Sequence, residues 1–195
     1  TDGYFQKKCE KFIKNKTKTK FVSLTHSGTS ALEIAINLLN IGKGDEVLIP
    51  SYTFTSTANS VIMSGAKPVF IDVDKNLNID AEKLEKKISK KTKAIIAVDI
   101  FGRSCDIPSI KKIINGKNIK IISDSAQTPY SIYKNNIAGT LGDIGGYSLN
   151  CHKHINTGEG GVLVTNNNYF AKRMKLLRNH AENYQSFRKK KKIKN

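Results

Sequence analysis

One lysine in this sequence stands in surroundings that could give its amine a chemical role. Lys153 lies between His152 and His154 in the stretch 143–161, with Ser148 before it and Gly-Glu-Gly-Gly after it. A lysine amine is an effective nucleophile and proton carrier when a partly dry pocket makes its neutral form accessible. The alternative is an ordinary surface lysine in a glycine-rich turn.

The residues around Lys153 predict a loop between two strands. An apolar run with Ile144, Tyr147 and Leu149 leads into the loop, and a second apolar run at 162–164 follows it. The glycines of the 158–161 segment allow positive φ values or a close approach to a ligand. We therefore expect the loop to lift Lys153 off the end of a sheet.

A second segment has the residues of an anion site. A short strand at 21–24 runs into Thr-His-Ser-Gly-Thr-Ser, and a helix with a strong apolar side follows to about residue 39. Free backbone N–H groups and the helix dipole at such a turn, around Gly28 and Thr29, attract an anion. The glycine spacing matches neither the Walker nor the dinucleotide pattern. An ordinary helix cap uses the same residue types, so both interpretations stay open.

The remaining chain alternates strands with helices. Apolar strands are predicted at 47–49, 69–73, 94–98 and 119–123, and helices at about 55–64, 80–88 and 107–114. This alternation predicts an α/β fold, a three-layer α/β/α domain with a mostly parallel central sheet. Ligands in such domains bind beyond the carboxyl ends of the strands.

Four features are predicted to meet at that rim. They are the turn at 27–30, an aromatic side chain (Phe54 or Tyr52), the carboxylate of Asp124 and the amine of Lys153. Pyridoxal phosphate needs this set: a Schiff-base lysine, an acid facing the ring nitrogen, a phosphate cup and a flat apolar surface on the ring. Asp124 has a simpler alternative, which is to cap a helix at the end of its strand.

Net charge is the unusual feature of the composition. The 195 residues include 33 Lys and Arg against 16 Asp and Glu, a formal net charge of +17, concentrated at 7–20 and 187–195. Neither segment interleaves its lysines with stacking aromatic residues, so weak, salt-dependent polyanion binding is expected rather than specific nucleic-acid recognition. A basic anion-binding or nucleic-acid-binding module stays open as an alternative function.

Other compositional features predict a cytoplasmic protein that does not enter membranes. The sequence has no apolar run long enough to span a bilayer and no signal-peptide pattern. Its three cysteines, Cys9, Cys105 and Cys151, have no metal-site spacing and cannot all pair internally. This cysteine usage is typical of a reducing compartment.

Taken together, the motifs resemble the DegT-type sugar aminotransferases, fold-type-I pyridoxal-phosphate enzymes that act on nucleotide-linked keto sugars. The resemblance covers most of the chain, and its segments follow the family's order. They are 27–36 (SGTSALEIAI), 44–61 (GDEVLIPSYTFTSTANSV), 65–74 (GAKPVFIDVD), 123–127 (SDSAQ), 148–166 (SLNCHKHINTGEGGVLVTN) and 176–180 (LLRNH).

The resemblance implies a role for each matching site residue. Lys153 would bind the cofactor covalently, Asp124 would pair with the ring nitrogen, and Gln127 would lie by the ring hydroxyl. The phosphate would be held by Ser148 with Gly28 and Thr29, and Phe54 would stack on the ring. Related sugar dehydratases carry histidine in place of this lysine, so Lys153 favours transamination. No metal site is expected at His152 and His154.

The resemblance also implies the domain organisation and the partners. Residues 1–178 would form the cofactor-binding large domain, and 179–195 a basic tail or the start of a truncated C-terminal region, with the family's small C-terminal domain missing. The implied activity moves an amino group from an amino acid, usually glutamate, to a nucleotide-linked keto sugar for surface polysaccharide or glycoconjugate biosynthesis, in a homodimer. The alternative is a truncated, non-catalytic fragment.

Overall fold

The structure, a computed structural model, describes residues 3–179 and residue 181. Predictions on residue 180 and on 182–195, including the basic segment 187–195, lie outside the described residues. The boundary between residues 178 and 179 stays a prediction. None of the described helices is both long and apolar enough to cross a membrane.

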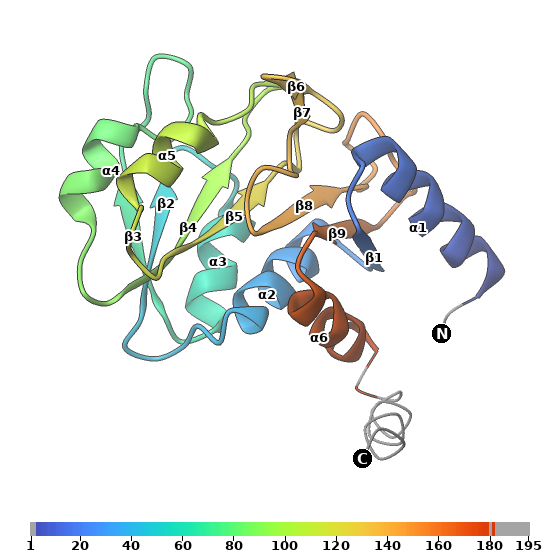
Figure 1. Ribbon diagram of the computed structural model, residues 1–195. Coiled ribbons are helices and arrows are strands. Elements are labelled where there is room, and N and C mark those ends of the chain that lie inside the picture. The colour runs from blue at the N-terminus through green and yellow to red at the C-terminus, as the bar shows by residue number, and fades with distance from the viewer. Residues whose placement is uncertain (1–2, 180, 182–195) are drawn as a thin grey trace.

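Helices and strands alternate along the chain as predicted (Figure 1). The helices are α1 (Tyr4–Thr17), α2 (Gly28–Leu38), α3 (Thr55–Met63), α4 (Ala81–Lys87), α5 (Ile107–Ile113) and α6 (Asn168–Arg178). The strands of the main sheet are β1 (Phe21–Thr25), β2 (Glu46–Pro50), β3 (Lys67–Ile71), β4 (Thr92–Val98), β5 (Lys120–Asp124), β8 (Ile144–Ser148) and β9 (Gly161–Thr165).

The sequence did not predict α6 or the small hairpin of β6 (Ile132–Tyr133) and β7 (Asn136–Ile137). The sequence has a weak helical apolar period at 4–13. Helix α1 extends beyond it to Thr17, which is buried and whose hydroxyl donates to the carbonyl of Ile13 at 2.8 Å. The other predicted boundaries agree with the structure to within two residues.

The main sheet has seven strands in the order β1-β9-β8-β5-β4-β2-β3. The strands from β8 to β3 are parallel, whereas β9 runs antiparallel to both β8 and β1. The register sets Val98 beside Asp124 and Asp124 beside Gly146, so the ends of β4, β5 and β8 lie together. The predicted mostly parallel sheet is confirmed.

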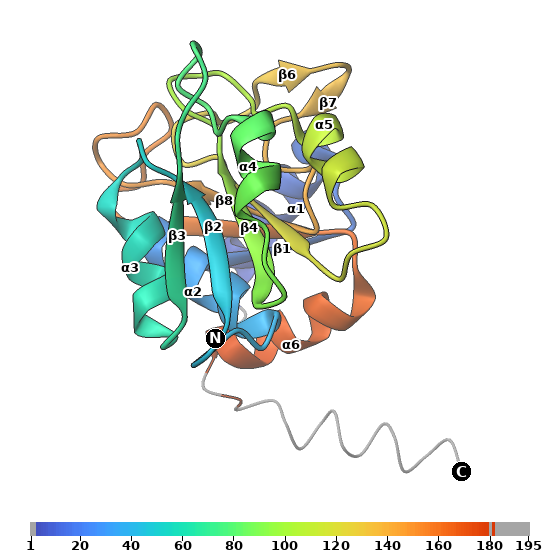
Figure 2. The same cartoon turned by 90° about the vertical axis from the view of Figure 1, so that its left-hand side faces the viewer.

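Helices cover both faces of the sheet (Figure 2). Helices α2, α3 and α6 share one apolar core with side chains such as Ile96 and Ile122. On the opposite face, α4 and α5 pack against Ile95 and Ile121, and α1 packs against Val162 and Val164. The sheet is therefore the middle layer of an α/β/α domain, as predicted.

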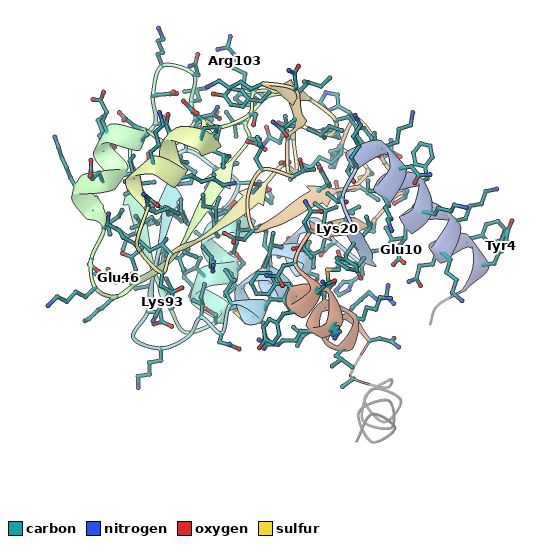
Figure 3. The ribbon with its side chains drawn as sticks, in the orientation of Figure 1. Tyr4, Glu10, Lys20, Glu46, Lys93 and Arg103 are labelled. Carbon is teal, nitrogen blue, oxygen red and sulfur yellow. The ribbon has the colours of Figure 1, made fainter. Side chains whose placement is uncertain are left out.

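Figure 3 marks the two ends of the sheet with labelled side chains. Glu46 and Lys93, near the beginnings of β2 and β4, lie at one end, and Arg103, which follows β4, lies at the other. The chain leaves β4, β5 and β8 at the end marked by Arg103, where the loops that carry the predicted site residues begin.

Candidate functional site

A cavity of about 350 Å³ lies beyond the carboxyl ends of the parallel strands. Its lining includes every site residue predicted from the sequence: Gly28, Thr29, Phe54, Asp124, Gln127, Ser148 and Lys153. These residues come from loops and helix ends that are far apart in the sequence. The structure thus brings the whole predicted set to one place, while the role of each residue stays a prediction.

One wall of the cavity is formed where α2 begins next to the end of β8. Ser27 caps α2, because its hydroxyl accepts the N–H of Ser30 at 3.0 Å. A helix begins with N–H groups that have no helical partner, and those of Gly28 and Thr29 are among them. A Cβ on Gly28 would lie 2.9 Å from the Cβ of Ser148, so only glycine lets α2 approach this closely.

A second helix, α3, begins at the same wall. The sequence analysis predicted this helix but not that its first turn lines the site. The hydroxyls of Thr29 and Ser56 lie 2.8 Å apart, so the first turn of α3 meets the first turn of α2. Ser56 and Thr57 also line the cavity. The signal was present in the sequence, because residues 46–57 repeat the strand, polar turn and helix pattern of residues 21–30.

Asp124 ends β5 and is almost completely buried, with 6% of its surface exposed. One carboxylate oxygen accepts the hydroxyl of Thr57 at 3.0 Å, and the other accepts the N–H of Ala126 at 3.2 Å. Burial raises the pKa of Asp124, against these two hydrogen bonds and the charge of Lys153, which lower it. The helix-cap alternative is wrong, because residues 125–131 contain turns and no helix.

Gln127 is oriented by the backbone of another loop. Its side-chain oxygen accepts the N–H of Phe101 at 3.3 Å. A backbone N–H can only donate, so the oxygen of the Gln127 amide must face Phe101 and its NH₂ group is left as a donor. Phe101 itself has a φ of 47°, which is unusual for a side chain of this size.

The structure separates the two aromatic candidates. Phe54, which precedes α3, lines the cavity and keeps 66% of its surface exposed. Tyr52 does not line the cavity, and its ring instead lies 6.1 Å from the ring of Phe101. Phe54 is therefore the aromatic side chain that is available to a ligand in this cavity.

Lys153 lies on the loop between β8 and β9, as predicted, and its side chain is partly exposed. The loop is closed at its base by a hydrogen bond from the N–H of Thr157 to the carbonyl of Leu149 at 2.9 Å. The side chains of Asn150 and Glu159 join across it at 2.8 Å. These contacts hold the turn that carries Lys153, whose N–H bonds to the carbonyl of Asn150 at 2.9 Å.

Within the described residues, no group of three or more His, Cys, Asp or Glu side chains could hold a metal ion. Cys9, Cys105 and Cys151 are all free thiols. The polar groups that line the cavity include the amine of Lys153, the buried carboxylate of Asp124, hydroxyls and backbone N–H groups. This donor set suits an anionic organic ligand with one basic ring atom.

The model of the DegT/DnrJ/EryC1/StrS aminotransferase family matches residues 1–194. The chain belongs to this family. The resemblance predicted from the motifs is thereby confirmed.

Relatives of this DegT-family chain include sugar-modifying proteins. It is 39% identical over 177 residues to a GDP-perosamine synthase of Caulobacter vibrioides, a match that covers 90% of this chain and 48% of the relative. It is 40% identical over 156 residues to the dTDP-3-amino-3,6-dideoxy-alpha-D-galactopyranose transaminase of Aneurinibacillus thermoaerophilus, a match that covers 79% of this chain and 43% of the relative. The chain spans about half the length of the curated relatives it matches.

A solved structure supports the fold assignment of this family member. A GDP-4-keto-6-deoxymannose-3-dehydratase with a trapped PLP-glutamate geminal diamine has a TM-score of 0.89 at 29% identity, covering 94% of this chain and 49% of that one. The transaminase relative and this dehydratase thus match the same chain. The fold alone does not separate the two chemistries, and the residues of the cavity must do so.

Proposed function

We propose that this chain is the cofactor-binding part of a pyridoxal-phosphate-dependent sugar aminotransferase. The observation that carries the proposal is the single cavity that collects Lys153, Asp124, Ser148 and the beginning of α2. Each of these groups matches a different chemical need of the one cofactor. Membership of an aminotransferase family supports the same activity.

The residues of the cavity fit the cofactor's phosphate. The N–H groups at the beginning of α2 and the hydroxyl of Ser148 lie on one wall, and the helix dipole there favours negative charge. The contact of Gly28 with Ser148 brings these donors together. Gly28, Thr29 and Ser148 would hold the phosphate, with the hydroxyl of Ser56 beside Thr29.

The residues of the cavity also fit a protonated ring nitrogen. Pyridoxal phosphate, when bound, supplies a carbonyl carbon that carries the amino group and a ring that accepts electrons. Asp124 would hold the proton at the ring nitrogen, and Thr57 keeps one oxygen of that carboxylate in place. The NH₂ group of Gln127 would donate to the ring hydroxyl, while Phe54 would cover one face of the ring and exclude water.

Lys153 would bind the cofactor through its amine and, once released by substrate, would move a proton at the substrate's reacting carbon. An amine at this position favours transamination over the dehydration carried out by family relatives in which histidine replaces the lysine. The substrates of the proposed reaction are an amino-acid donor, with glutamate expected, and a nucleotide-linked keto sugar. The product would serve surface polysaccharide or glycoconjugate biosynthesis.

We further propose that the whole protein acts in the cytoplasm as a homodimer and that residues 1–178 form its large domain. The exposure of Phe54, which keeps 66% of its surface accessible at the cavity, supports the presence of a further domain or subunit beside this one. A sugar substrate needs further walls, which a second domain or a second subunit would provide.

A spectrum of the purified chain with added pyridoxal phosphate tests the proposal. We expect a visible absorbance band that borohydride removes, and peptide mapping that finds the reduced adduct at Lys153. Lys153→Ala should bind the cofactor reversibly and yield no such adduct. Lys172→Ala, at an exposed position of α6, is a matched control that should behave as the parent chain.

The proposal fails if a well-folded chain forms no adduct, or if the adduct persists in Lys153→Ala. Loss of polyanion binding on adding salt, together with no cofactor absorbance, would instead support a basic, non-catalytic module.

A further inference from the structure

A second buried carboxylate lies behind Asp124. Asp99 directly follows β4, and only 1% of its surface is exposed. Among the described residues, no Lys, Arg or His forms an ion pair with it. A buried charge without a neighbouring cation destabilises a fold. A residue of this kind next to a candidate site is therefore a candidate for a functional role.

Asp99 is bonded to the turn that carries Asp124 and Gln127. Its N–H donates to the carbonyl of Asp124 at 2.9 Å, and its own carbonyl accepts the hydroxyl of Thr128 at 2.7 Å. Its carboxylate accepts the hydroxyl of Ser125, the residue next to Asp124. The turn at 124–128 is therefore fixed to Asp99 at both of its ends.

The side chains of Asp99 and Asp124 lie on opposite faces of the sheet. Asp124 faces α3, where Thr57 donates to it, whereas Asp99 faces the side of α5, where its other oxygen accepts the N–H of Cys105 at 2.7 Å. Asp99 thus does not occupy the cavity or touch a ligand there. It can act on the cavity only through the turn and through its charge.

The groups that face Asp99 leave its charge unneutralised. They are the hydroxyls of Ser104 and Ser125, the N–H and the thiol of Cys105, and the like charge of Asp124. The phenol of Tyr147 also interacts with the charge of Asp99. Burial raises the pKa of Asp99 to about 6, against the hydrogen bonds from Ser125, Cys105 and Ser104. Asp99 is therefore largely ionised at neutral pH.

We propose that Asp99 is a positioning residue that acts through Asp124: it fixes the turn that holds Asp124, and its negative charge strengthens the hold of the site on the proton of the cofactor's ring nitrogen. This inference rests on the proposed function. A negative charge behind Asp124 makes the loss of a proton from the ring nitrogen less favourable, because that loss leaves two uncompensated carboxylates close together.

A purely structural role would be to anchor the Cys105 loop and the turn. Asparagine could make comparable hydrogen bonds without burying a charge, because the hydroxyl of Ser125 can accept as well as donate. The two roles therefore differ in what Asp99→Asn changes. A structural role affects folding, whereas the proposed role changes the proton affinity of the bound cofactor.

The test is a pH titration of pyridoxal phosphate bound to the chain, labelled at the ring nitrogen and followed by NMR chemical shift and visible absorbance. We expect Asp99→Asn to lower the pH at which the ring nitrogen loses its proton by about one pH unit. Ser125→Ala keeps the charge and removes one contact, so its shift should be smaller and in the same direction. The double variant should shift no further than Asp99→Asn alone.

Asp72→Asn is the matched control, since it removes the same charge from a side chain that is 70% exposed. It should leave the titration unchanged because solvent screens the lost charge. An Asp99→Asn chain that binds the cofactor and titrates as the parent would overturn the inference and leave the proposed function standing. If the Asp99→Asn variant does not fold, a Ser125→Ala titration that matches the parent overturns the inference about Asp99. A parent chain that binds no cofactor overturns both this inference and the proposed function.

Discussion

Gly28 and Ser148 lie so close together that a Cβ added to Gly28 would stand 2.9 Å from the Cβ of Ser148. The contact joins the first residue of α2 to the last residue of β8. It therefore sets the width of the phosphate cup that we propose, and it depends on the absence of one side chain.

Gly28→Ala should weaken the binding of pyridoxal phosphate by about tenfold or more, because Ser148 must move to admit the new methyl group. Equilibrium titration of cofactor absorbance measures this. Gly42→Ala is a suitable control, because its new Cβ would have only ordinary contact with the carbonyl of Ser64 at 3.6 Å. Equal affinity of the Gly28→Ala and Gly42→Ala chains would contradict the proposed cup.

Ser148→Ala should weaken pyridoxal phosphate binding by about tenfold or more, because hydrogen bonds to charged groups contribute about 1.5–3 kcal/mol. Affinity for pyridoxal, which lacks the phosphate, should stay unchanged. Ser23→Ala removes another buried hydroxyl, one without a partner, and should leave both affinities as they are. A parallel loss of affinity for both compounds would place Ser148 away from the phosphate.

Thr57→Val removes the hydroxyl that donates to Asp124 at 3.0 Å and should reduce stability by about 1–3 kcal/mol. The lost bond favours the ionised carboxylate, so its removal raises the pKa of Asp124 further. The penalty should therefore be small in acid and grow as pH rises through the range in which Asp124 ionises. Urea denaturation at several pH values measures it, and a penalty that is independent of pH would argue against this bond.

Asp99→Asn should change the pH dependence of stability. Folding raises the pKa of Asp99 from 3.8 to about 6. Between these values the folded chain holds a proton that the unfolded chain has lost, so the parent chain loses stability as pH rises. The free energy of unfolding of the variant, relative to that of the parent, should rise by about 3 kcal/mol over this pH range and should not change further above it. Denaturation curves of both chains without cofactor, taken at several pH values, measure this difference. A difference that does not change with pH would contradict the prediction.

Local signals were enough to predict the positions of most elements and site residues. Asp124 follows the isoleucine-rich segment 119–123, and Lys153 lies in a glycine-containing stretch between two apolar segments, so each marks a strand end in the sequence. Parallel strands place such ends at one rim, which is why the predicted site residues lie around one cavity.

Contacts made across long stretches of chain could not be predicted in the same way. Thr57 and Asp124 are 67 residues apart, and nothing in either segment alone identifies the other as its partner. Asp99 follows its strand as one more polar residue, and its role as an anchor depends on where Ser125 and Cys105 fold. The hairpin at 132–137 is too short for an apolar period to mark it.

Strand β9 returns antiparallel beside β8, so the loop that carries Lys153 leaves the sheet and rejoins it at neighbouring positions of the same rim. The loop joins the two strands directly, with no helix between β8 and β9. Evolution can thus alter the reactive group, by substitution or by a change in loop length, while the scaffold beneath it is conserved. Relatives with the same fold can therefore differ in chemistry, because the loop that carries the reactive residue is distinct from the sheet that forms the core.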